Sequence, residues 1–564
     1  VEETGDTDVS GEESEEEQPG NTQQQPNEEE ISETPAEQPG SLSANDAEAM
    51  AVTQSVEIQA ATPIRSDKIN DITWSLYKDN DGSKRLVLEG TGDYTKGGGA
   101  KPPWSGLEIN AAKVNVKGIT STRNLFFKLE YLESVDLSGL DTGSLTDMAG
   151  MFAVGGDDVL WDEGNLIVWG RLASLDLTGL DVKRVTDMGR LFSHCGGLRK
   201  LKIDGWKTGN VRDMSGMFEY CAELELTADT LKNLDTSQVT NMSRMFAYYA
   251  YKRTYSSPVT DLDLSGFRTL NVENMSGMFD SMAYVQNLDI SSFRTSNVTD
   301  MSRMFAQCVN LRTLNGVGGF DTGNVTNMSH MFAGCKSLKG IEVSDFDTSS
   351  VTNMNGMFAE CGGLGSLDLG SFDMGKTTDA TGMLDGCTGL KRIGVPVNCK
   401  VDVALPEGPW YQADGTEYTG TTLPKNLSAS MTLYKEKPTE GAIKSVSVSG
   451  VTMSSKEYDG TSCSYTGTPV LMDEAGNSIT GVTITPSYSG SLVDGTPYDE
   501  TDAAPTLAGS YTLSFQVSNL DTGKYRLGKT AYRFSIRRRN VTITAPDVRI
   551  EKGEDLPAVE KLTC

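Results

Sequence analysis

The residues best suited to metal binding or nucleophilic chemistry recur at fixed positions in this sequence. Only two histidines, His194 and His330, are present, and they stand far apart. A zinc site needs four ligands at close spacing, which this arrangement does not offer. We expect a column of small buried thiols, since free Cys behaves as a small hydrophobe, with disulfides between neighbouring repeats as the alternative. Six of the nine cysteines follow a recurring aromatic or leucine by three residues: Cys195, Cys221, Cys308, Cys335, Cys361 and Cys387.

Carboxylates also recur in register, at Asp141, Asp181, Asp321, Asp347 and Asp373. A catalytic pair should be singular, so we interpret these residues as turn formers that bond the local backbone. A cation bridging stacked carboxylates is the alternative, and counting carboxylates alone leaves a glycosidase open. The sequence contains no phosphate-binding loop, no dinucleotide fingerprint and no metalloprotease motif. We therefore predict no enzymatic activity, no cofactor and no metal.

A column of arginines is the strongest candidate for anion recognition. Arg190, Arg244 and Arg303 stand two residues after a recurring Met, at a position that is otherwise Gly or His. Guanidinium groups at such a position could grip carboxylates or sialylated and sulphated glycans. A flexible surface turn explains the same pattern without a ligand.

The elements that must position these residues are set by a repeat with nine copies between Met148 and Leu384. A unit of about 26 residues cannot bury its apolar face until a neighbour stacks on it, so the period predicts a solenoid. Solenoids offer long surfaces and mostly bind other molecules. The recurring aromatic advances in steps of 40, 26, 28, 33, 26, 27, 26 and 26 residues through Phe152, Phe192, Phe218, Phe246, Phe279, Phe305, Phe332, Phe358 and finally Leu384.

Each copy combines two periodicities. The LxxLDLS segment (Leu172 to Thr178) alternates with period two and predicts a short strand, FDTS or FDTG predicts a turn, and VTxM predicts a second short strand. SxMFxxC places Met304, Phe305 and Cys308 on one side of a short helical turn. We predict a β-rich, leucine-rich-repeat-like solenoid of short strands and short helical turns, with the Met and Phe columns in its core.

Two copies are enlarged, and their insertions supply most of the candidate contact residues. Insertions in repeat proteins map to loops on one face, often the contact face, and exposed Tyr and Arg are rich in contact hot spots. The first insertion (Gly155 to Ala173) contains Trp161 and Trp169. The second (Tyr248 to Pro258) contains Tyr248, Tyr249, Tyr251, Lys252, Arg253 and Tyr255. We predict that these side chains, together with the three arginines of the column, contact a ligand.

Composition divides the rest of the chain. Residues 1–64 carry 17 acidic side chains and no Lys or Arg, in a chain of net charge −29, which predicts a disordered acidic linker. Asp-Gly dipeptides at Asp81 and Asp414 predict tight hairpins. We expect an N-terminal β cap at 65–131, the solenoid at 132–396, a C-terminal cap hairpin at 397–438, an all-β Ig-like sandwich at 439–540 and the truncated start of a further β module at 541–564.

The charge and the hydropathy pattern limit the partners. A strongly negative chain repels phosphate backbones, so we expect no nucleic acid partner. No run approaches the roughly 18 apolar residues of a membrane span. We therefore expect any signal peptide or anchor to lie outside this chain.

The repeat LDLSxFDTSxVTxMSxMFxxC resembles the BspA-like leucine-rich repeats of bacterial surface proteins, in the Met-Phe variant of mycoplasma-type lipoproteins. The match runs from about Leu132 to Leu390, and two flanking segments (Trp74 to Trp104 and Trp410 to Thr419) are similar to that family's caps. The segment from Lys456 to Ile543 is similar to YDG/MBG-type Ig-like modules of secreted bacterial proteins. The resemblance implies extracellular display, adhesion or host-protein binding, and no catalysis. It brings no ligand motif whose residues could be carried over.

These observations predict a secreted bacterial cell-surface protein without enzymatic activity. The main hypothesis is an adhesin or interaction module that binds a host or bacterial surface protein, or a glycan, through the solenoid. The alternatives are a structural spacer or surface-layer component without a dedicated ligand, and a non-catalytic accessory region of a larger secreted enzyme.

Overall fold

The structure is a computed structural model. The predicted acidic linker lies outside the described residues except for residues 62–64, and the predicted further module lies outside them entirely. The described residues are 62–94, 101–154, 170–249, 261–396, 398–427, 431–438, 444–453, 455–473, 477–492, 497–522, 524–528 and 530–537.

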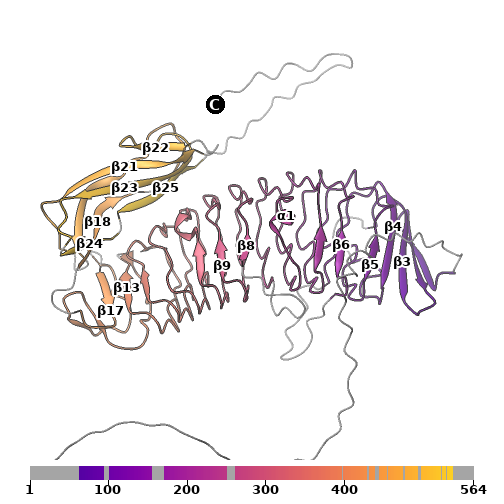
Figure 1. Cartoon of the computed structure of the whole chain (residues 1–564), viewed down its shortest axis with the longest axis horizontal. Helices are drawn as coiled ribbons and strands as arrows, with labels where there is room; N and C mark the ends of the chain where they lie inside the picture. Colours follow the sequence, from indigo (N-terminus) through magenta and orange to yellow (C-terminus); the bar gives the residue numbers. More distant parts are fainter. Residues whose placement is uncertain are drawn as a thin grey trace, which may run out of the picture. The chain divides into compact units, whose positions relative to one another are not determined.

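A five-stranded sheet precedes the repeats (Figure 1). β1 (Arg65–Ile69), β2 (Ile72–Lys78) and β3 (Lys84–Thr91) are antiparallel, whereas β4 (Ala111–Lys117) and β5 (Ser134–Asp136) continue the sheet in parallel. The predicted tight turn lies between β2 and β3, where Gly82 has φ +90° and donates to the Asp79 carbonyl over 3.0 Å. The sheet therefore changes from hairpin pairing to the parallel pairing of the solenoid, which covers the edge that the first coil would expose.

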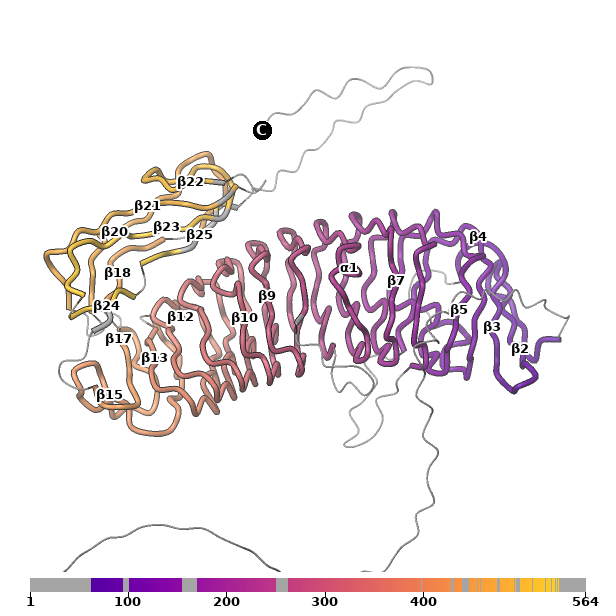
Figure 2. Tube along the Cα trace, viewed as in Figure 1, coloured from indigo at the N-terminus to yellow at the C-terminus, as the bar shows by residue number. Residues whose placement is uncertain are grey.

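The solenoid coils are joined by short parallel strands, which lie side by side in Figures 1 and 2. Leu262, Leu288 and Leu314 stand opposite one another in three neighbouring strands, so that like residues stack coil on coil. The predicted solenoid fold is confirmed. The strands are β6 (Ser174–Asp176), β7 (Lys200–Lys202), β8 (Asp261–Asp263), β9 (Asn287–Asp289), β10 (Thr313–Asn315) and β11 (Ser366–Asp368).

On another face of the coil, the predicted second strand is reduced to one bridging residue per coil. Nine parallel bridges link Ser121 to Asp379 through an Asp or Asn of each intervening coil. The side chain of this residue caps its own turn: Asp300 Oδ1, for example, accepts from the Ser302 amide over 2.8 Å. Irregularities are local, with α1 (Ala228–Leu231) in the third repeat, where the sequence departs from the pattern, and a 3₁₀ turn η3 (Val317–Gly319).

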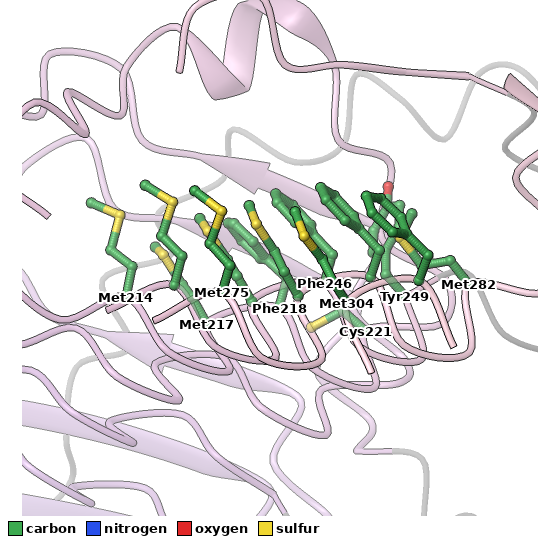
Figure 3. Close-up of a cluster of buried hydrophobic side chains, with 14 of the residues drawn as sticks. Met214, Met217, Phe218, Cys221, Phe246, Tyr249, Met275, Met282 and Met304 are labelled. Carbon is green, nitrogen blue, oxygen red and sulfur yellow. The ribbon is translucent and has the colours of Figure 1, made fainter. Parts of the chain in front are cut away.

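The core is a set of stacked columns of Met, Phe and Cys side chains (Figure 3). From Phe126 to Phe358, successive rings of the Phe column lie with centroids 5.3–5.9 Å apart. Each of the six column cysteines is buried and donates its thiol to the carbonyl of the Phe in the preceding coil, over 3.0–3.2 Å. The prediction of buried, unpaired thiols is confirmed for these residues.

The segment around the Met-Phe pair differs from the helical turn that we expected. Arg303 and Gln307 have φ +57° and +56°, which a right-handed helix does not allow. The amides of Arg303, Phe305 and Gln307 donate to carbonyls of the next coil over 2.6–2.9 Å, while the intervening amides close tight turns. The segment therefore alternates between local turns and bonds to the neighbouring coil.

The solenoid ends in antiparallel pairing. β13 (Arg392–Val395) continues the parallel run from β11 and then pairs antiparallel with β17 (Met431–Tyr434). The predicted Asp-Gly turn is present at Gly415, with φ +83°. The remaining cap strands are β12 (Asp373–Met374), β14 (Asn398–Cys399), β15 (Trp410–Tyr411) and β16 (Glu417–Tyr418).

The C-terminal module has two sheets around its own hydrophobic core, with strand orders β20-β18-β24 and β19-β25-β23-β21-β22. Val448, Leu471, Leu513 and Phe534, from both sheets, lie in this core. Its assignment to an Ig-like family stays a prediction. The strands are β18 (Lys444–Thr452), β19 (Lys456–Glu457), β20 (Thr466–Asp473), β21 (Thr483–Leu492), β22 (Pro497–Thr501), β23 (Gly509–Ser518), β24 (Tyr525–Leu527) and β25 (Ala531–Arg537).

Candidate interaction surface

The arginine column occupies a left-handed backbone position in every coil. Such a conformation favours Gly, which explains the glycines of this column. The long side chains lie over glycines: a Cβ on Gly216 would stand 3.2 Å from Arg190 Cγ, and one on Gly277 would stand 3.3 Å from Arg244 Cγ. The Arg190 and Arg244 side chains thus lie close over the glycines of the next coil. The column has φ between +55° and +65° at Gly150, Arg190, Gly216, Arg244, Gly277, Arg303, His330, Gly356 and Gly382.

Two arginines of the column are held by buried carboxylates. Arg244 donates from Nε and a terminal nitrogen to Glu219 Oε1, over 2.8 and 2.6 Å, and the Glu219 side chain is only 6% exposed. Arg303 donates from Nε to Asp280 Oδ2 over 2.8 Å, where Asp280 is 1% exposed. Burial lowers the pKa of Arg244, but the charge and hydrogen bonds of Glu219, together with the charge of Asp280, raise it, and the net shift is upward.

These ion pairs change how the column can act. A guanidinium that already neutralises a buried carboxylate offers its remaining N–H groups to a ligand, but little net charge. Arg244 and Arg303 are therefore poorer anion-binding groups than unpaired arginines at the same positions would be. The ion pairs fix the orientation of the two guanidinium groups, because a buried carboxylate that loses its charged partner raises the free energy of the folded chain.

A stack of three rings lies beside this column. The His194 and Tyr220 ring centroids are 4.4 Å apart, and those of Tyr220 and Tyr248 are 4.2 Å apart with an interplanar angle of 8°. All three residues are half-buried and have left-handed backbone conformations, with φ of 63°, 57° and 55°. The structure thus brings together rings that are 26 and 28 residues apart in sequence.

The stack lies between the points where the two insertions join the solenoid. The first insertion begins after Val154, one coil before His194, and the second, Tyr248 to Pro258, begins with Tyr248 itself. We define the ring–arginine surface as His194, Tyr220 and Tyr248 together with Arg190, Arg244 and Arg303. Its three rings stand in consecutive coils and its three arginines in alternate coils, and Tyr and Arg are side chains enriched in binding hot spots.

The predicted contact residues have different outcomes. Tyr248 and the three arginines lie on the ring–arginine surface, whereas the prediction for Tyr249 is wrong, because its side chain is 0% exposed. Its hydroxyl donates to the Leu224 carbonyl over 2.8 Å and accepts from the Leu226 amide over 3.1 Å. Tyr249 thus satisfies backbone groups of the irregular third repeat. Trp161, Trp169, Tyr251, Lys252, Arg253 and Tyr255 lie outside the described residues.

Sequence reasoning missed His194 and Tyr220. The signal was available, because both stand two residues after the column phenylalanine, as Tyr248 does. Comparing copies position by position would have shown a His, a Tyr and a Tyr in three consecutive copies. The tyrosines of the second insertion are close in sequence, whereas His194, Tyr220 and Tyr248 come together only when the coils stack.

The remaining reactive groups have structural roles. Burial raises the pKa of Cys195, Cys308 and Cys361 to about 12, so these thiols stay protonated and poorly nucleophilic. The predicted turn role of the column aspartates is confirmed, since Asp347 accepts from the Ser349 amide over 3.0 Å and Asp373 from the Gly375 amide over 2.8 Å. Among the described residues, no group of three or more His, Cys, Asp or Glu could hold a metal ion. In the same part of the chain, no helix is long and apolar enough to span a membrane.

Comparison with known proteins adds one family and two structures. Residues 104–157, 169–257, 226–316, 249–340 and 310–393 match the model of a family described as "Mycoplasma protein of unknown function, DUF285". A leucine-rich repeat protein from Eubacterium ventriosum is similar in structure, with 17% identity, coverage of 63% of this chain and 99% of that chain, and a TM-score of 0.26. The pneumococcal vaccine antigen PcpA matches with 10% identity, coverage of 56% and 89%, and a TM-score of 0.21. No match was found among curated proteins. The repeats of this chain are thus similar to those of a mycoplasma-type repeat family.

Proposed function

We propose that this chain is a non-enzymatic bacterial surface protein whose solenoid binds a partner through the ring–arginine surface. The observation that carries the proposal is the stack of His194, Tyr220 and Tyr248, held in register between the attachment points of two insertions. The C-terminal module serves in this proposal as part of a stalk that displays the solenoid.

The surface is suited to binding because it is ordered before a partner arrives. Each ring is fixed by its neighbour, and Arg244 and Arg303 are fixed by buried carboxylates. Ordering a free Tyr or Arg on binding costs about 0.5–1.5 kcal/mol for each side chain. In this chain these side chains are already ordered when the chain folds, so binding does not have to order them. Tyr and Arg are also the side chains enriched in binding hot spots.

The stacking geometry favours a protein over a glycan as the partner. Both faces of the Tyr220 ring are covered, one by His194 and the other by Tyr248. A covered face cannot receive the flat side of a sugar ring. The stack therefore presents ring edges and polar groups, which suit the mixed polar and apolar surface of a folded protein.

The test is capture of ligands from arrays of purified host proteins and glycans by the whole chain. The variant His194→Ala/Tyr220→Ala/Tyr248→Ala should lose the protein signal at least tenfold. Tyr77→Ala/Tyr411→Ala, which removes two half-buried tyrosines from the two caps, is the matched control and should keep it. Equal capture by both variants would remove the ring–arginine surface from the proposal. An array without any signal would favour the structural spacer.

A further inference from the structure

Tyr220 and Tyr248 are arranged for a reaction between their rings. The centroids are 4.2 Å apart and the planes are within 8° of parallel. The Tyr220 amide donates to the Ala247 carbonyl over 2.9 Å, and the Tyr248 amide donates to the Asp280 carbonyl over 2.7 Å. The backbones that carry the two rings are therefore held in adjacent coils by hydrogen bonds and cannot drift apart without opening the solenoid.

We propose that Tyr220 and Tyr248 are a site of oxidative crosslinking, at which a peroxidase using hydrogen peroxide joins the two rings through a carbon–carbon bond. Each phenol loses one hydrogen atom from its hydroxyl to give a tyrosyl radical. The two radicals couple at the ring carbons next to the hydroxyls, and the hydrogens on those carbons move to the oxygens and restore both phenols. The peroxide accepts the two hydrogen atoms and becomes two molecules of water.

Burial raises the pKa of Tyr220, and the neighbouring Tyr248 phenol raises it further. The Tyr220 phenol therefore stays protonated at neutral pH, so its oxidation removes a proton with the electron. Both side chains are only half-buried, so an external oxidant can reach them. The product would be a covalent bond between neighbouring coils at the point where the second insertion leaves the solenoid.

A second pair of neighbouring tyrosines in the chain serves as a comparison. Tyr498 and Tyr511 in the C-terminal module are also neighbours, but their centroids are 5.3 Å apart, their planes meet at 85° and Tyr511 is 2% exposed. This pair is edge-on and wider apart than Tyr220 and Tyr248, and the Tyr511 ring is out of reach of an external oxidant. Geometry therefore predicts a crosslink between Tyr220 and Tyr248 in preference to one between Tyr498 and Tyr511.

The experiment treats the dilute whole chain with horseradish peroxidase and hydrogen peroxide, followed by peptide mapping by mass spectrometry and dityrosine fluorescence. We expect one dominant intramolecular peptide pair, Tyr220 with Tyr248, lighter than the sum of its parts by two hydrogen atoms, and a higher melting temperature. Tyr220→Phe and Tyr248→Phe keep the ring stack but should each abolish this product, whereas Tyr498→Phe should not change it. The same treatment in urea should scatter the crosslinks over many tyrosines.

Two results would overturn the proposal. One is dityrosine fluorescence that persists undiminished in Tyr220→Phe, and the other is a native crosslink pattern that matches the scattered pattern in urea. Neither depends on the binding partner, so this site can fail while the proposed function stands, and the reverse also holds.

Discussion

The Phe305 ring lies parallel to the Phe332 ring of the next coil, with centroids 5.5 Å apart and an interplanar angle of 5°. Phe279 stacks on its other face at the same distance, 5.5 Å. One ring therefore joins three coils. The relationship repeats along the solenoid, and it makes each coil depend on its neighbours.

Phe305→Ala should lower the free energy of unfolding by about 3–5 kcal/mol, because it opens a cavity between two stacked rings. Chemical denaturation monitored by circular dichroism measures the change. Tyr131→Ala, at a side chain that is 38% exposed, is the control and should cost less than about 1 kcal/mol. A loss below 1 kcal/mol at Phe305 would contradict its place in the core.

Arg303→Ala should destabilise the chain by about 1–3 kcal/mol, because the buried Asp280 carboxylate loses its charged partner. Arg294→Ala, at an exposed arginine that donates to the nearby Ser291 and Phe293 carbonyls, should change stability by less than about 0.5 kcal/mol. Adding Asp280→Asn to Arg303→Ala should recover part of the loss. Thermal denaturation of the wild type, the two single arginine variants and the double variant measures these changes. Equal losses from both arginine variants would show that the ion pair does not stabilise the chain.

Gly277→Val should cost about 1–3 kcal/mol, because a β-branched residue is strained at φ +60° and its Cβ would stand 3.3 Å from Arg244 Cγ. Gly277→Asn should cost less, since Asn tolerates the left-handed region. Comparing the melting temperatures of Gly277→Val and Gly277→Asn separates the strain of a β-branched residue in the left-handed region from the effect of adding any side chain at this position. If Val and Asn cost the same, the left-handed column is not what selects these residues.

Thermal stability should fall when the pH is lowered below about 4. Hydrogen bonds from Ser265 and Ser291 hold the pKa of Asp263 and Asp289 below the usual range. A carboxylate whose folded pKa is lowered contributes stability above its unfolded pKa of about 3.9, and this contribution is lost as the pH falls through the folded value. Asp263→Asn/Asp289→Asn keeps an acceptor oxygen without the titration, so its melting temperature should decline less between pH 5 and pH 3. A wild-type melting temperature that rises on acidification would reverse the predicted sign.

Much of the solenoid could be predicted because the period and the positions of the apolar residues recur in each copy of the repeat. The turn aspartates could be predicted because local hydrogen bonds fix them. The conformation around Phe305 could not, because Met304, Phe305 and Cys308 have helical spacing, while half of the amides bond to a coil 26 residues away. Tyr248 and Tyr249 show the same limit: one residue of sequence separates a surface ring from a fully buried one, and only the stacked coils decide which is which.

The most direct test of coil-on-coil stacking is alkylation of the native chain with iodoacetamide at pH 8, read by peptide mass spectrometry. The six column cysteines are buried and form no disulfides, and burial raises the pKa of Cys387, for example, to about 11. We expect none of the six column thiols to be labelled in the native chain, and all of them to be labelled in urea without reductant. Rapid native labelling of these thiols, or disulfides between them, would contradict a shared interior that runs through the stacked coils.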